Sequence, residues 1–438
     1  MKNNLGYYLK FKRATRKKDL SATILMLLPF LLIIGLFFVN QTLAQREQAA
    51  ISARNQMISE NAQEFLDRDT SQDDYDYDYS EQYYQAWFES GQNDLERIEV
   101  YEHGTFLERL KRENQEFDTF YNVPLQEWDY PEEEVETYGF YVKPFVDGKR
   151  LVNNYLIDQQ IADDSIRYGT NTATFLISLS VYLTGIGGLC YFMLCFGFNQ
   201  LKQNENDKYR FLAVQPLQRR TIFLADFLEF LGRSVGYLLL LIVFAYSLAW
   251  LFGEASSWDY PVLTTVSGQM SSLTILPVWH YLVIVFGMFL VNLSGFYFIT
   301  LLIFLLIRKS FVSIFFSLAI FAYFFVLSQV SWPTNLQEAI SYSPTTYVTP
   351  SAILIGQSNE EQQLISDGGS RGNPEDDTFS LFYFLFTAEN GGYYTVANLA
   401  RKTGNGQISW QRGWLSSGIF TGLMAAISSW LFKKKMCS

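Results

Sequence analysis

Three charged side chains stand next to a long apolar run and are the best candidates for chemistry at a membrane. Asp226, Glu229 and Arg233 follow one another at spacings of three and four residues, so on a helix they lie along one face. Ionisable groups near a membrane core are costly unless they are paired or kept at the interface. We therefore expect Asp226 or Glu229 to pair with Arg233, Arg219 or Arg220. The alternative is that these charges only anchor the end of a helix.

Residues suited to catalysis or metal binding are scarce. The chain has two histidines, His103 and His280, which fall in different regions. Patterns for phosphate binding or zinc chemistry (GxxxxGK[ST], HExxH, paired CxxC) are absent from the sequence. We expect no enzymatic activity, no metal and no cofactor in this chain. The three cysteines, Cys190, Cys195 and Cys437, are expected to serve packing.

The composition indicates a membrane protein with a sizeable polar part, because 49% of the 438 residues are hydrophobic and 17% are aromatic. Six apolar runs reach or approach the roughly 20 residues that a bilayer core requires. The sequence thus predicts an all-α polytopic membrane protein with six transmembrane helices and a large mixed α/β extracellular domain between the first two helices. The expected transmembrane helices are residues 21–40, 173–198, 230–252, 278–307, 311–330 and 414–432. The other parts are an amphipathic cytoplasmic segment 1–20, the extracellular domain 41–172, a cytoplasmic coupling segment 199–229, an extracellular loop 253–277, a cytoplasmic turn 308–310, an extracellular loop 331–413 with a re-entrant or interfacial candidate at 379–387, and a cytoplasmic tail 433–438.

Lysine and arginine near the ends of the expected spans set the orientation. They cluster in segments 1–20 and 199–229, at Arg308-Lys309 and at 433–435. With six spans all of these lie on one side, which we expect to be the cytoplasm of a multi-pass protein of the cell membrane, with both termini inside. The outer domain is acidic, with 29 Asp and Glu against 11 Lys and Arg in 41–172.

The outer domain mixes several local patterns. Residues 46–68 have the composition of a helix former and should extend the first span as a polar helix. The acidic and aromatic run 73–81 lacks the glycine and the glutamate that a calcium loop requires, so we expect a solvated acidic face. Residues 95–120 have a helical pattern, whereas 138–146 has the pattern of a strand that ends at the Asp-Gly turn 147–148.

Small residues in the second span indicate helix packing. Gly185, Gly187 and Gly188 form a patch that lets another helix approach closely. Because this patch lies within an apolar run and no Lys-Ser or Lys-Thr follows it, we do not interpret it as a phosphate loop.

The fourth apolar run contains both glycines and polar groups. It is about thirty residues long, so we expect it to be tilted or broken, with Gly287 and Gly295 as break points. Asn292 and Ser294 lie in its middle, where helix–helix hydrogen bonding is favoured over contact with a substrate.

An amphipathic passage, residues 204–233, separates two long apolar runs. Phe211, Leu212 and Val214 stand among charges, and Pro216 breaks the helix because it lacks an N–H and its ring clashes with the preceding turn. A short helix, a proline turn and a second helix that enters the membrane form a shape that can receive force from a soluble partner.

Residues 211–224, FLAVQPLQRRTIFL, resemble the cytoplasmic segment of the type-2 ATP-binding cassette exporter permeases. In that family a leucine-rich helix is followed by Pro, a small or apolar residue, one or two basic residues and an apolar start of the third span. Residues 343–350 and 408–413 are also similar to the family, as are the six spans, the inside termini and a large first outer loop of the kind found in Gram-positive bacterial members. Members often carry a lysine near the position where this chain has Asp226.

The resemblance implies a mechanism that needs partners. A separate nucleotide-binding ATPase subunit, which holds ATP and magnesium, would dock on the coupling segment, and its dimerisation would rearrange a pathway between two permease chains, either identical or different. Apolar side chains would contact the ATPase and basic ones would surround them. The residues expected at this contact are Lys208, Tyr209, Arg210, Phe211, Leu212, Pro216, Leu217, Arg219 and Arg220.

The same resemblance implies export of a peptide or other amphipathic substrate, and no nucleic acid is expected to bind. An acidic outer domain concentrates positive ligands, which favours cationic peptides. A different class of function stays open: a membrane sensor or receptor subunit that binds peptides through 41–172 without transport. A membrane-bound enzyme is disfavoured by the scarcity of catalytic residues.

Overall fold

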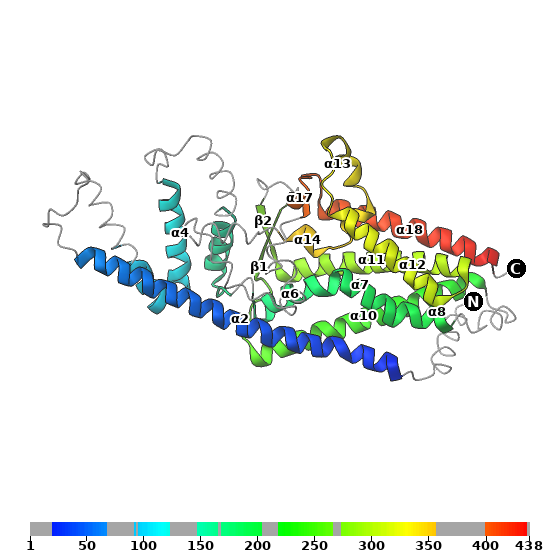
Figure 1. Ribbon diagram of the computed structural model, residues 1–438, viewed down its shortest axis with the longest axis horizontal. Coiled ribbons are helices and arrows are strands. Elements are labelled where there is room, and N and C mark those ends of the chain that lie inside the picture. The colour runs from blue at the N-terminus through cyan, green and yellow to red at the C-terminus, as the bar shows by residue number, and fades with distance from the viewer. Residues whose placement is uncertain are drawn as a thin grey trace. The chain divides into compact units, whose positions relative to one another are not determined.

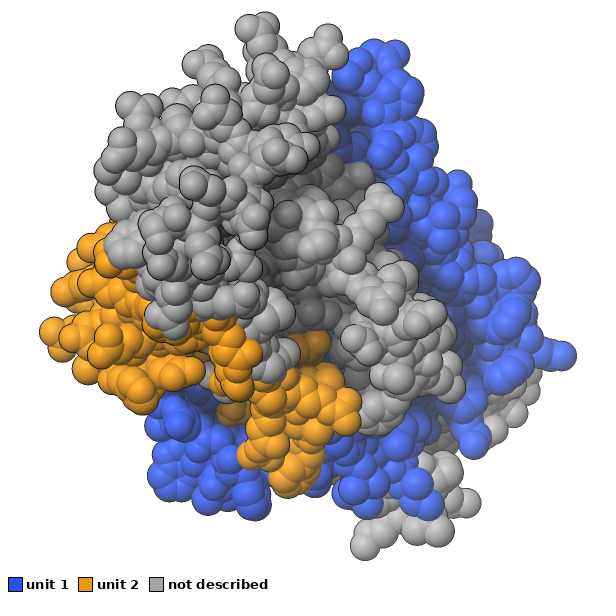
Figure 2. Space-filling view, turned by 60° about the vertical axis from the view of Figure 1, so that its left-hand side comes forward, with its two compact units in different colours: residues 1–37, 171–438 blue, residues 38–170 orange. Residues whose placement is uncertain are grey.

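The computed structural model describes residues 20–67, 92, 95–122, 147–164, 168–203, 218–265, 273–355 and 399–435. Most of these residues are helical. The chain divides into two compact units, one of residues 1–37 with 171–438 and one of residues 38–170 (Figure 2). Each unit has its own core and is described separately below.

The first unit is a bundle of long apolar helices. In the described part of the chain, five helices are long and apolar enough to cross a membrane, and a bent helix pair makes a sixth span if it is counted as one. The chain is therefore a multi-pass membrane protein. The five helices are α2 (Leu20–Asp67), α10 (Arg219–Phe252), α11 (Val278–Ile307), α12 (Ser310–Ser328) and α18 (Trp410–Lys435).

The second apolar run is bent at a glycine. Helix α6 (Thr172–Thr184) ends at Gly185, and α7 (Ile186–Phe192) continues at an angle of 64° to it. The chain then widens into the π-helix η2 (Met193–Phe198) and ends as α8 (Asn199–Gln203). The run 173–198, expected as one transmembrane helix, is thus a bent pair with a π-helical end.

Helices α11 and α18 lie side by side and run parallel (Figure 1). Two hydroxyl groups of α18 donate to carbonyls of α11 at the same sequence offset: Thr421 Oγ1 to Val291 at 3.0 Å and Ser428 Oγ to Phe298 at 2.9 Å. This constant offset shows that the two helices stay in register over two turns. Their ends at Ile307 and Lys435 therefore lie at the same end of the bundle.

The two glycines of α11 are contact points and not break points, so of the two alternatives, a tilted or a broken fourth span, the broken one is wrong. α11 is continuous from Val278 to Ile307. A Cβ added at Gly287 would lie 2.7 Å from the ring of Trp414, and one added at Gly295 would lie 2.9 Å from Thr421 Oγ1. Glycine at both positions lets α18 approach closely, as small residues do in membrane helix pairs.

Helix α2 carries Pro29 inside its apolar part. Proline has no N–H, so the carbonyl four residues earlier, that of Leu25, loses its helical partner. Tyr191 of α7 donates to the Leu25 carbonyl at 3.0 Å, and Tyr237 of α10 donates to the Met26 carbonyl at 2.6 Å. Tyr191 therefore supplies the donor that the proline removes from the Leu25 carbonyl, and Tyr237 adds a bond to the next carbonyl.

Residues 253–277 contain a hairpin that the sequence did not predict. Strand β1 (Pro261–Thr265) pairs antiparallel with β2 (Leu273–Pro277), with Leu263 opposite Ile275. Just before the hairpin, the Glu254 carbonyl accepts a 3.0 Å hydrogen bond from the N–H of Thr172, the first residue of α6. The hairpin thus belongs to the end of the bundle at which α6 begins.

The chain after α12 packs back against the bundle. It forms α13 (Thr334–Ile340), the 3₁₀ turn η5 (Pro344–Tyr347), α14 (Ser351–Leu354) and α17 (Leu399–Lys402). Tyr347 is fully buried, and its carbonyl accepts a 2.7 Å hydrogen bond from the side chain of Asn292 in the middle of α11. Asn292 therefore forms a packing bond as expected, whereas Ser294 bonds to the Leu290 carbonyl of its own helix. The candidate re-entrant segment 379–387 lies outside the described residues.

The described part of the second unit is helical. It contains the later part of α2, which reaches Asp67 as expected for 46–68, together with helical residues 95–103, α4 (Phe106–Asn122) and helical residues 147–159. Asn153 bonds the Glu113 carboxylate at 2.7 Å and so joins the last of these helices to α4. The expected strand 138–146 and the acidic run 73–81 lie outside the described residues.

Candidate functional site

The structure places the charges of α10 at one end of the helical bundle. Arg219 and Arg220 form the first turn of α10, and Asp226, Glu229 and Arg233 follow within its first fifteen residues. The other residues expected to contact a partner lie outside the described residues: Lys208, Tyr209, Arg210, Phe211, Leu212, Pro216 and Leu217.

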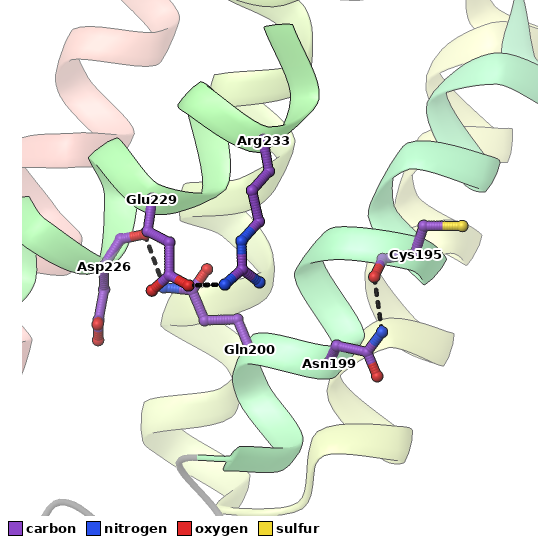
Figure 3. Close-up of polar contacts among 6 residues, drawn as sticks. All are labelled: Cys195, Asn199, Gln200, Asp226, Glu229 and Arg233. Carbon is purple, nitrogen blue, oxygen red and sulfur yellow. Dashed lines mark hydrogen bonds and ion pairs between the residues drawn. The ribbon is translucent and has the colours of Figure 1, made fainter. Parts of the chain in front are cut away.

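Glu229 and Arg233 form the ion pair that the sequence predicted, one helical turn apart (Figure 3). Their side chains are 12% and 24% exposed, so the pair is largely shielded from solvent. Pairing of this kind is what a charged group near a membrane core requires.

Asp226 is more deeply placed, with 2% of its surface exposed. Its backbone carbonyl accepts a 2.6 Å hydrogen bond from the side-chain amide of Gln200 in α8 (Figure 3). On the same short helix, the side chain of Asn199 donates to the Cys195 carbonyl at 2.8 Å and holds the end of η2. Because residues 204–217 connect α8 to α10, the Gln200 bond ties together the two ends of the coupling segment.

Arg219 connects α10 to the last helix. Its guanidinium donates a 3.1 Å hydrogen bond to the Lys433 carbonyl, and Phe223, one turn later, packs edge-on against Phe432. Phe223 also stacks on Phe298 of α11 at 5.8 Å. The start of α10 is thus held against both α18 and α11.

The basic residues of separate connections meet at this end of the bundle. The Gln200 bond brings α8 to α10, the Arg219 bond brings α10 to α18, and α11 ends beside α18. The described basic residues at this end are Lys202, Arg219, Arg220, Arg308, Lys309, Lys433 and Lys434. These residues are the ones whose clustering near the ends of the expected spans led us to predict a cytoplasmic face.

The glycine patch of the second span has a different role from the expected one. A Cβ at Gly188 would lie 1.8 Å from the Leu183 carbonyl oxygen, and one at Gly185 would lie 3.0 Å from that of Val181. At Gly187 no atom lies within 4 Å of an added Cβ. The crowding at these positions comes from the bend between α6 and α7 and not from a neighbouring helix.

A pocket opens beside the start of α10. It has a volume of about 720 Å³ and is lined by Gln218, Arg219, Arg220, Trp430, Lys433 and Lys434, which together define the basic pocket. Sequence reasoning assigned the arginines to a partner contact and the lysines to the tail, and it missed that they share one cavity. Only the packing of α10 against α18 brings together residues about 210 positions apart, as the Arg219–Lys433 bond shows.

Comparisons with protein-family models, with curated proteins and with solved structures give no match to this chain. The site is therefore interpreted from its own geometry. Among the described residues, no group of three or more His, Cys, Asp or Glu side chains comes together to hold a metal ion. What the site offers is a mechanical connection: the two ends of the coupling segment are bonded to each other, and its α10 end is bonded to the last transmembrane helix.

Proposed function

We propose that this chain is the membrane subunit of a type-2 ATP-binding cassette exporter and that the coupling segment receives force from a separate ATPase subunit. The proposal rests on the sequence resemblance of residues 211–224. The observation that carries it furthest is the position of Arg219, which lies within that segment, begins a continuous 34-residue helix and is bonded to α18.

The bonds around the coupling segment support this role. A displacement of residues 204–217 would pull on α8 through Gln200 and on α18 through Arg219. Because α10 is unbroken as far as Phe252, it would carry the same displacement across the bundle. Rigid elements of this kind are needed to transmit a conformational change between two sites.

The gathering of basic residues at one end of the bundle supports a cytoplasmic position for the coupling segment and for the C-terminal end of α18. The six spans, both termini inside and a location in the cell membrane belong to this proposal. ATP and magnesium would bind in the ATPase subunit, and a second permease chain, identical or different, would complete the pathway.

The contact with the ATPase is testable by co-purification. We expect Leu212→Asp combined with Leu217→Asp to abolish capture of an ATPase subunit by the tagged chain, because charges replace the apolar contact. The matched control, Leu212→Met with Leu217→Met, keeps apolar volume and should keep the complex. Undiminished capture by the aspartate variant would count decisively against the proposal.

The substrate class follows from charge. The acidic balance of residues 41–172 favours a cationic peptide or another amphipathic substrate. In proteoliposomes that contain the chain and its ATPase, we expect such peptides to stimulate ATP hydrolysis and to move across the membrane. Peptide binding that is insensitive to salt would remove the electrostatic basis for this substrate class.

A sensor or receptor subunit is the competing function, and the same acidic domain would serve it. In that case peptide would bind to the full chain, but no peptide would cross the vesicle membrane and no ATPase would co-purify. A genetic neighbour encoding a kinase would favour sensing, whereas a neighbouring ATPase would favour export.

A further inference from the structure

The basic pocket lies where the first turn of α10 meets the last turns of α18. Two arginines, Arg219 and Arg220, come from α10, and two lysines, Lys433 and Lys434, come from α18. Four cationic side chains around one shallow, open depression of the surface create a local preference for an anion.

The backbone adds to this preference. α10 begins in the wall of the pocket, and the N-terminal end of a 34-residue helix carries a partial positive charge. Gln218 at the N-cap makes no side-chain capping bond to the first turn. The carbonyl end of α18 lies close by, but there the Lys433 carbonyl already accepts the guanidinium of Arg219 at 3.1 Å. The positive N-terminal end of α10 therefore favours binding of a phosphate group in the pocket.

Trp430 indicates the depth at which the pocket lies in a bilayer. Its ring is 62% exposed, and the ammonium of Lys434 lies 5.5 Å from the ring centroid. Tryptophan beside lysine at the end of an apolar helix is typical of the headgroup region of a membrane. A ligand in the pocket would therefore lie among lipid headgroups.

Apolar side chains continue from the pocket toward the middle of the bundle. Leu224 and Leu228 of α10 are 52% and 46% exposed, and Leu423 and Ile427 of α18 are 56% and 45% exposed. These side chains offer a surface for acyl chains directly beyond the charged groups. A soluble phosphate would gain nothing from this surface, whereas a phospholipid would use both parts.

We propose that the basic pocket binds the phosphate-bearing headgroup of an anionic phospholipid, which joins the ends of α10 and α18. The phosphate would lie between Arg220 and Lys434, and the acyl chains would follow the exposed leucines and isoleucine of the two helices. The proposal does not depend on transport or on the ATPase partner, because it rests on the charges, the cavity and Trp430.

The test uses the full chain purified in zwitterionic nanodiscs. Phosphatidylglycerol is titrated while the melting temperature is followed, and bound lipids are counted by native mass spectrometry. We expect Arg220→Gln combined with Lys434→Gln to weaken phosphatidylglycerol binding by on the order of tenfold or more, because each basic residue contributes to attraction of an anionic lipid. This pair leaves the Arg219 bond to the Lys433 carbonyl in place. The matched control, Lys202→Gln with Lys309→Gln, removes the same charge from the same end of the bundle and should change binding by less than about twofold.

Two further arms separate the sources of the anion and the kinds of partner. Inorganic phosphate at the same concentration should not raise the melting temperature, and phosphatidylglycerol with brominated chains should quench a fluorescence component that is lost in Trp430→Phe. The charge-preserving variant Arg220→Lys with Lys434→Arg should restore binding, which separates loss of charge from misfolding.

Several results would overturn the proposal. They are equal stabilisation by phosphate or by phosphatidylcholine, an unchanged lipid count in the glutamine pair, and the same loss in the control pair. Loss of a protein partner in the glutamine pair, with lipid binding intact, would instead assign the pocket to a protein contact.

Discussion

The phenol of Tyr237 donates a 2.6 Å hydrogen bond to the backbone carbonyl of Met26, three residues before Pro29. Tyr191 donates to the neighbouring carbonyl of Leu25, and the two phenol oxygens lie 2.9 Å apart. Tyr191 of α7 thus replaces the donor that Pro29 removes, and Tyr237 of α10 bonds the next carbonyl of α2. In an apolar surrounding, a carbonyl without such a donor carries a large desolvation cost.

We expect Tyr237→Phe to destabilise the protein by about 0.5–1.5 kcal/mol, because it removes one hydrogen bond between α10 and the backbone of α2. The measurement is unfolding of the purified chain in mixed micelles at increasing denaturing detergent. Tyr323→Phe is the matched control, since the side chain of Tyr323 is 60% exposed on the bundle surface. An equal loss in the two variants would contradict the role of the Met26 bond.

The role of Pro29 can be isolated in the same assay. Pro29→Ala restores an N–H that can reach the Leu25 carbonyl. In that background Tyr191→Phe should cost clearly less than it does in the native chain, a coupling of roughly 0.5–3 kcal/mol for residues that share one network. Equal costs in both backgrounds would show that Tyr191 does not compensate for the proline.

The glycines of α11 and α10 should respond with opposite signs to the same substitution. Gly295→Ala places a methyl group 2.9 Å from Thr421 Oγ1 and 3.3 Å from the ring of Phe420, so we expect a loss of about 1–3 kcal/mol from overpacking. At Gly236 no atom lies within 4 Å of an added Cβ, so alanine should stabilise by up to about 1 kcal/mol through helix propensity. Unfolding of the two variants side by side measures the difference, and a shared sign would argue against close α11–α18 packing.

Asn292 should hold the η5 turn in place. We expect Asn292→Leu to remove the bond to the Tyr347 carbonyl and to cost about 1–3 kcal/mol. Hydrogen exchange should accelerate at the amides of 345–347 more than elsewhere in the bundle. Ser294→Ala is the control, because its hydroxyl bonds only within its own helix. If hydrogen exchange at amides 345–347 is unchanged in Asn292→Leu, apolar packing alone holds η5 in place.

The capping box of the second unit should make the start of α4 sensitive to acid. The N–H of Thr105 donates to the Glu108 carboxylate at 2.7 Å and its hydroxyl does so at 2.9 Å, and these bonds hold the pKa of Glu108 below its usual 4.5. A carboxyl with a lowered pKa in the folded state stabilises fully above its unfolded pKa and loses this effect as the pH falls through the folded value. The protection of amides 106–109, relative to the intrinsic exchange rate at each pH, should therefore fall below about pH 4, as it should in Glu108→Gln at neutral pH. A Glu108→Gln variant with unchanged exchange at neutral pH would contradict the box.

The sequence predicted the long helices well for a physical reason. In an apolar phase every backbone polar group must be bonded within the chain, so a run of twenty apolar residues has few alternatives to a helix. α11 and α12 accordingly begin and end close to the expected limits, and the pair Glu229–Arg233 follows from spacing on one helix.

The remaining features depend on partners that are distant in sequence. A glycine in an apolar run permits either close packing or a bend, and nothing local decides that Gly185 breaks the helix while Gly287 does not. Asn292 was recognised as a packing group, but its acceptor is the carbonyl of Tyr347, 55 residues away. The hairpin of β1 and β2 was missed because seven residues separate the two strands, whereas the strongest sequence signal for a hairpin is a two-residue turn between them.

The ion pair at the start of α10 gives the last prediction. Removing one partner leaves a shielded charge, so Arg233→Leu should cost on the order of 3–5 kcal/mol, whereas Glu229→Leu combined with Arg233→Leu should recover much of that loss. Exchange of the charges, Glu229→Arg with Arg233→Glu, keeps the pair but reverses its favoured order along the helix, in which the carboxylate precedes the cation, so its stability should be intermediate. Unfolding of the single, double and exchanged variants in denaturing detergent measures the coupling free energy between Glu229 and Arg233. Additive losses would mean that Glu229 and Arg233 stabilise the helix independently, and the pair would then serve only to anchor the helix end.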